Sequence, residues 1–170
     1  MDTLRRQSCV RTLERMSLRT ALVAVALVLL GIAIVAPHGS SSKGPYHADP
    51  TRTPGVLNPD VTQATTGSTI CVHGWTKTIR PPTSYTNDLK RKQMREYGVG
   101  GALDDYQEDH LISLELGGHP TDPRNLWPEP YPRASEVDSI ENELNAKVCS
   151  GDVSLAKAQL QESELKHTDG

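Results

Sequence analysis

The stretch EDHLISLELGG at residues 108–118, followed by NLWP at residues 125–128, decides how this chain is interpreted. It places an acid and a histidine side by side, as Asp109 and His110, in a short apolar run. A Gly-Gly pair follows, and Asn125 comes 15 positions after His110. A histidine that accepts a proton beside a carboxylate that binds a divalent metal ion is a combination suited to hydrolysis of a phosphodiester.

The residues around this stretch predict two strands followed by a helix. Residues 107–114 read as an extended segment, which the glycines turn back into a short strand at residues 125–127. Apolar residues then recur every three or four positions from Val137 to Val148, which predicts a helix over about residues 134–148.

The flanking residues predict further elements. β-Branched residues between positions 68 and 79 predict a strand, and residues 87–97 predict a helix that Thr86 caps and Gly98 ends. A last helix is expected over residues 154–165. The expected fold is therefore α+β, with a strand–turn–strand–helix unit as its centre.

The chemistry predicted for this unit depends on few side chains. His110 is the candidate general base, because a neutral imidazole can take a proton from water near pH 7. Asp109 is a candidate metal ligand. Asn125 faces His110 across the turn, so it could orient the imidazole or give its amide oxygen to the metal. Mg²⁺ is the expected ion, with Mn²⁺ or Zn²⁺ as alternatives, since Mg²⁺ needs only one or two carboxylates.

A third metal ligand is expected from the helix after the second strand. Asp138 is the candidate, with Glu136 and Glu141 as nearby alternatives. A plain acid near a helix N-terminus is the alternative interpretation of Asp138. Arg124 could hold the scissile phosphate, or it could equally pair with Asp122.

The N-terminal region differs from the rest of the chain. Five arginines precede an uncharged run at residues 20–36, which would span about 26 Å as a helix against a hydrocarbon core of roughly 30 Å. We expect a basic cytoplasmic region at 1–19, a signal anchor or signal peptide at 20–36 and a flexible linker at 37–59. The folded domain is expected at 60–166. It would lie outside the cell membrane, as a single-pass protein or, after cleavage, a secreted one.

The net charge and the cysteines limit the possible functions further. Removing residues 1–36 takes away five arginines and two acids, which leaves 13 basic and 19 acidic residues, a net charge of −6. This is not typical of a tight nucleic-acid binder, although basic residues between Lys77 and Arg95 form either a phosphate-facing patch or a solvated helix face. Cys71 and Cys149 would form a disulfide in an oxidising compartment; two buried thiols are the alternative.

These residues resemble the HNH endonuclease family. The segment from Asp109 to Leu114, the Gly-Gly pair and Asn125-Leu126 look like that family's D-H, G-G and N-L elements. The wider chain, over roughly residues 61–159, looks like a group of small exported bacterial proteins of uncharacterised role. The resemblance to the HNH family implies a ββα-metal fold, His110 as the general base, Asp109 as a metal ligand and Asn125 as the middle asparagine.

Two features depart from the family pattern. Ser113 replaces the usual proline, and no histidine occurs between His119 and His167, so Asp138 would replace the family's last metal ligand. The expected function is a divalent-metal-dependent endonuclease that acts on DNA or RNA outside the cytoplasmic membrane, with no small-molecule cofactor. The alternative is a catalytically inactive HNH-like envelope domain that binds a protein or a wall polymer.

Overall fold

A two-stranded antiparallel sheet carries the residues around His110. Strand β1 (Tyr106–His110) pairs with strand β2 (Leu126–Pro130), so that Asp109 lies opposite Trp127. The predicted first strand was longer, but the chain leaves the sheet after His110 and forms a 3-10 turn at Leu114–Leu116. In a two-stranded sheet each strand has a free edge, which explains how β2 contains two prolines.

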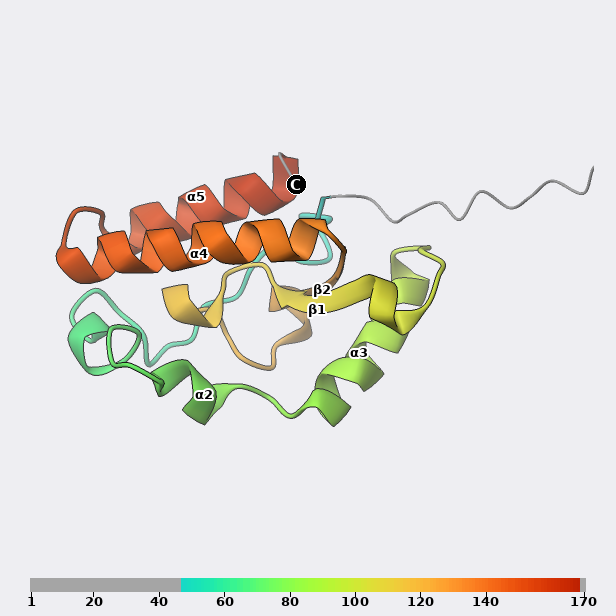
Figure 1. The fold of residues 1–170 in the computed structure, drawn as a ribbon, viewed down its shortest axis with the longest axis horizontal. Coiled ribbons are helices and arrows are strands. Elements are labelled where there is room, and N and C mark those ends of the chain that lie inside the picture. The colour runs from blue at the N-terminus through green and yellow to red at the C-terminus, as the bar shows by residue number, and fades with distance from the viewer. Residues whose placement is uncertain (1–46, 169–170) are drawn as a thin grey trace, which may run out of the picture. The chain divides into compact units, whose positions relative to one another are not determined.

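Four helices surround the hairpin in the part of the chain that the computed structural model describes, residues 47–168. Helices α4 (Arg133–Ser150) and α5 (Leu155–Thr168) lie side by side on one side of the hairpin, and α3 (Thr83–Glu96) contacts both strands from the other (Figure 1). The predicted α+β class is confirmed, as is the order strand, strand, helix from β1 to α4.

The strand predicted at residues 68–79 is wrong. The structure has a 3-10 turn at Thr66–Ser68, further turns, and the short helix α2 (Trp75–Ile79). Gly74 precedes α2 with φ at +80°, a conformation that ends an extended run and that glycine adopts without steric cost. The described residues therefore contain no flanking third strand; an isolated bridge joins Leu57 to Gly118.

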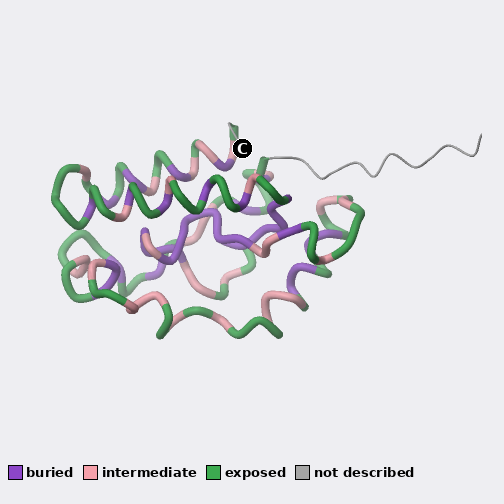
Figure 2. The backbone as a smooth tube through the Cα atoms, in the orientation of Figure 1, coloured by how far each residue is buried: buried purple, intermediate pink, exposed green. Residues whose placement is uncertain are grey.

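Two apolar clusters hold the elements together. The larger one joins α4 and α5 to the loop after β1, through residues that include Ile112, Leu116, Leu144 and Leu155. The smaller one places the fully buried Trp127 of β2 against Ala48 and Leu111, beside Tyr97. Buried backbone follows both strands and the facing sides of the helices in Figure 2.

The segment before residue 60 is part of this packing. Ala48 is buried and its backbone nitrogen donates to the carbonyl of Lys166 at the end of α5. Thr53 is fully buried, and its hydroxyl is 2.7 Å from that of Tyr97. Of the predicted linker at 37–59, residues 48–58 are thus held against the domain, so the folded part begins before residue 60.

The described residues contain no helix that is long and apolar enough to cross a membrane. The apolar run predicted as an anchor at residues 20–36 lies outside the described residues.

Candidate active site

His110 ends β1 and lines a cavity of about 280 Å³. Its ring Nε2 is 3.1 Å from the carbonyl oxygen of Pro120. Because a carbonyl only accepts hydrogen bonds, Nε2 carries the hydrogen and Nδ1 keeps its lone pair. Burial lowers the pKa of His110, although the charge of Asp109 opposes this shift. The imidazole is therefore neutral at pH 7, in the form that accepts a proton.

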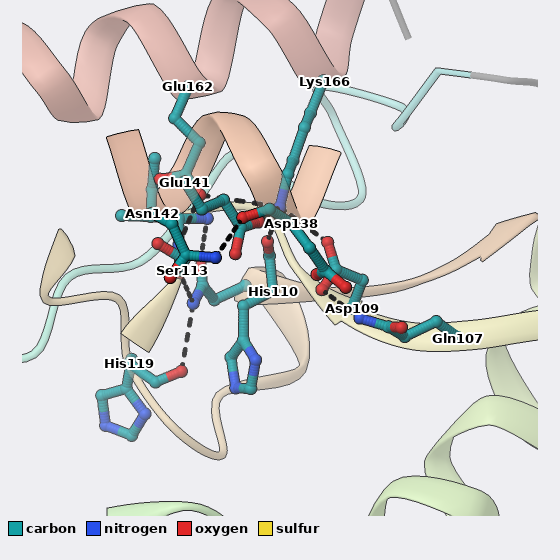
Figure 3. Close-up of polar contacts among 12 residues, drawn as sticks. Gln107, Asp109, His110, Ser113, His119, Asp138, Glu141, Asn142, Glu162 and Lys166 are labelled. Atoms are coloured by element: carbon teal, nitrogen blue, oxygen red, sulfur yellow. Dashed lines mark hydrogen bonds and ion pairs between the residues drawn. The ribbon is translucent and has the colours of Figure 1, made fainter. Parts of the chain in front are cut away.

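Three carboxylates line the same cavity. Asp109 comes from β1, and Asp138 and Glu141 come from successive turns of α4. One oxygen of each lies within 4.8 Å of the other two. Figure 3 shows them gathered on one side of His110, whose ring points away from them. The predicted Asp109 and Asp138 are thus close together, and Glu141, predicted only as an alternative, joins them.

A buried lysine, which the sequence did not point to, contacts this carboxylate cluster. Lys166 of α5 is fully buried, and its Nζ is 2.6 Å from Asp109 Oδ2 and 2.6 Å from Glu141 Oε1. Burial alone would lower the pKa of Lys166, but the carboxylates around it outweigh burial and raise that pKa well above its usual range. The ammonium is therefore charged, which makes it a fixed positive charge in the site.

Glu129 is a buried carboxyl group beside the cluster. It lies on β2, is fully buried, and neither of its side-chain oxygens has a hydrogen-bond partner among the described residues. Burial raises the pKa of Glu129 to about 9, and the charge of Asp109 adds to the shift. Glu129 is therefore protonated at pH 7 and adds no negative charge beside Asp109. Burial would raise the pKa of Asp109, but the charge of Lys166 and its hydrogen bond to Oδ2 outweigh burial and lower that pKa.

Burial raises the pKa of Glu141 to about 7 even though Lys166 opposes the shift. Burial, followed by the charge of Asp109, also raises the pKa of Asp138. Burial is the largest cause of both shifts, and the crowding of negative charge around Asp109 adds to it. A divalent cation would relieve this crowding, so the pKa values agree with the donor geometry.

Asn125 has a different role from either one predicted. Its side chain is fully buried, and its amide oxygen accepts from the backbone nitrogen of Ile112 at 3.0 Å. Its amide nitrogen donates to the carbonyls of Ile112 and His119. The side chain is thus used to fix the loop between the strands, and it reaches neither the His110 ring nor the carboxylates. Asn125 positions His110 through the backbone, and its assignment as a metal ligand is not supported.

Arg124 pairs with Asp122, the second of the two alternatives predicted for it. Its Nη2 is 2.7 Å from Asp122 Oδ2, and its Nε donates to Oδ1 of the same carboxylate. Arg124 does not line the cavity. His119 accepts two backbone N–H groups at its Nδ1 and so belongs to the structure of the same loop.

Arg80, and not Arg124, is the arginine that lines the cavity. It follows α2, is exposed and lines the cavity beside His110 and Glu115. Among residues 47–168 it forms no ion pair within 4 Å, while its charge acts on His110, Glu115 and Asp138.

Several other residues of the basic cluster have partners of their own. Lys90 is buried and donates to the carbonyl of Tyr106, and Arg91 pairs with Asp88 on the same helix. Of the basic residues predicted as a patch, Arg91 and Lys92 thus form ion pairs within their own helix, and Lys90 is buried.

Comparison of the chain with protein-family models, curated proteins and solved structures finds no match. The arrangement of the site itself is therefore the basis for assigning a function. Its cavity is lined by His110, whose imidazole is neutral and buried, by three clustered carboxylates, and by an arginine that has no ion pair within the described part of the chain.

Proposed function

We propose that this protein is a divalent-metal-dependent endonuclease that hydrolyses phosphodiester bonds of DNA or RNA outside the cytoplasmic membrane. The observation that carries the proposal is the hydrogen bond between His110 Nε2 and the carbonyl of Pro120. It leaves Nδ1 of a neutral, buried imidazole as a base, on a residue that lines the same cavity as a cluster of carboxylates. The order of β1, β2 and α4 supports a ββα-metal arrangement of the HNH type.

The donor set fits Mg²⁺ or Mn²⁺. Asp109, Asp138 and Glu141 offer only oxygen atoms, which these ions prefer. Zinc is less well matched, because both described cysteines form a disulfide and no described histidine belongs to the cluster. When bound, the ion would stabilise negative charge on the phosphate and on the leaving oxygen.

The other steps belong to the protein's own side chains. His110 would take a proton from the attacking water at Nδ1. Arg80, rather than Arg124, would bind a phosphate oxygen at the cavity, since its guanidinium forms no ion pair with any of the described residues. The Pro120 carbonyl would keep the imidazole in the tautomer that the reaction needs.

An extracytoplasmic site is supported by the disulfide between Cys71 and Cys149, because such bonds persist in oxidising compartments. The basic and apolar N-terminal sequence is consistent with membrane attachment or export. We propose a single-pass membrane protein with this domain outside, or a secreted protein if the apolar segment is removed.

One observation favours a second candidate function. Lys166 already occupies one oxygen of Asp109 and one of Glu141, so two of the three carboxylates have a cation partner without any metal. The alternative is therefore an inactive HNH-like envelope domain that binds a protein or a wall polymer.

A cleavage assay separates the two candidates. The oxidised full-length chain is incubated with plasmid DNA or RNA in Mg²⁺, Mn²⁺, Zn²⁺ or EDTA, beside His110→Ala. We expect metal-dependent cutting, which His110→Ala reduces by about 10²–10⁴-fold because the base is removed. His73→Ala is the control, since His73 is exposed and does not line this cavity. A folded wild-type protein that cuts neither substrate with any of the ions would support the inactive domain.

A further inference from the structure

Lys166 lies at the end of α5, 56 residues beyond His110 in the sequence, yet its ammonium is in the middle of the site. An ammonium has three hydrogens to donate. The structure gives it three acceptors: Asp109 Oδ2 at 2.6 Å, Glu141 Oε1 at 2.6 Å and the backbone carbonyl of His110 at 2.5 Å. Glu162 Oε1 lies further away, at 3.6 Å.

Lys166 contacts more carboxylates than a buried lysine needs to balance its charge. One carboxylate, such as the fully buried Glu162 on the same helix, would pair the charge. Lys166 instead bonds to two of the three carboxylates of the candidate metal site and to the backbone of the candidate base. It joins β1, α4 and α5 at that point, as Figure 3 shows for the side chains involved.

We propose that the Lys166 ammonium is a built-in cation of this site, which holds Asp109 and Glu141 in place and supplies part of the positive charge there. The proposal rests on the proposed function, because it concerns the same carboxylates. Asp109 and Glu141 each give one oxygen to Lys166, and their other oxygens, of which Asp109 Oδ1 also accepts from Gln107 Nε2 at 3.1 Å, remain for a divalent ion. Repulsion by the ammonium makes that ion bind weakly, and Asp109 and Glu141 are ordered before it arrives.

A charge-removing variant tests this inference without nucleic acid. In the full-length chain, Lys166→Met leaves Asp109 and Glu141 without their cation, so we expect the Tm in EDTA to fall by about 10–20 °C. Mn²⁺ should replace the lost charge and restore at least half of that fall. We also expect Lys166→Met to bind Mn²⁺ at least about tenfold more tightly than the wild type, as measured by titration calorimetry.

Two further variants make the outcome decisive. Lys157→Met, on an exposed face of the same helix, should change neither the Tm in EDTA nor the response to Mn²⁺. Adding Asp138→Asn to Lys166→Met should remove the rescue, because the third carboxylate is lost. The inference is overturned if Lys166→Met binds Mn²⁺ no more tightly than the wild type, or stays unfolded in saturating Mn²⁺. Since no cleavage is measured, an inactive nuclease would leave this result standing.

Discussion

Glu108 shows what burial does to a single carboxyl group next to the site. It lies on β1, and neither of its side-chain oxygens, both buried, has a hydrogen-bond partner among the described residues. Burial raises the pKa of Glu108 to about 8, although the charge of Lys90 opposes the shift. The group is therefore neutral in the folded protein at pH 7 and ionised in the unfolded chain.

This difference predicts how the free energy of unfolding changes with pH. Below about pH 4.5 both states hold the proton, and above about pH 8 both lose it; between these values the folded state alone is protonated, so stability falls as pH rises. Glu108→Gln removes this titration, so the free energy of unfolding should fall less steeply with pH, by up to about 1.4 kcal/mol per pH unit. Urea unfolding between pH 5 and pH 8 measures it. The exposed Glu164→Gln is the control, and equal slopes for Glu108→Gln and wild type would contradict the prediction.

The loop between the strands is the element on which the position of His110 depends. Its two ends are held together by Asn125, which bonds to both backbone groups of Ile112. Gly118 lies directly against this contact: a Cβ on it would be 1.7 Å from the Ile112 carbonyl oxygen and 2.7 Å from Asn125 Nδ2. The Gly-Gly pair is therefore required by close packing as well as by the turn.

Gly118→Ala should consequently disrupt the loop, because the clash is with backbone that cannot move aside without breaking the Asn125 bonds. We expect a loss of more than about 3 kcal/mol in the free energy of unfolding, together with loss of any nuclease activity. Gly67→Ala is the matched control, since a Cβ there meets nothing within 4 Å. Urea unfolding of the two variants gives the comparison, and similar stabilities would show that the loop yields easily.

Secondary structure could be predicted from the sequence where one local signal dominated. The apolar periodicity of α4 located that helix to within two residues at each end, and the glycines located the turn between β1 and β2. The strand prediction for residues 68–79 was wrong because the β-branched residues there favour a strand, whereas Gly74 and contacts with α4 set the conformation. Short segments whose tertiary contacts override propensity cannot be predicted in this way.

The same limit applies to the site at the scale of the whole molecule. Asp109 and His110 are adjacent in the sequence, so it could be predicted that both belong to one site. Arg80 and Lys166 come from the end of α2 and from α5, and only the packing of these elements brings Arg80 to the cavity and Lys166 to Asp109. A lysine in the last turn of a helix is ordinarily exposed, so the burial of Lys166 could not be inferred from its position in the sequence.

The disulfide connects these distant parts. It joins Cys71, before α2, to Cys149 in the last turn of α4, across 78 residues. Cys71 also packs against the larger apolar cluster, to which α4 and α5 contribute. Closing a loop of this length restricts the unfolded chain by about 4–5 kcal/mol in the chain-entropy treatment. The double variant Cys71→Ser/Cys149→Ser should therefore lose about 2–5 kcal/mol in urea unfolding. Reduced wild-type protein should lose a similar amount, because the same cross-link is removed without changing the side-chain volume. A double variant as stable as the oxidised protein would mean that apolar packing alone holds α4 to the segment before α2.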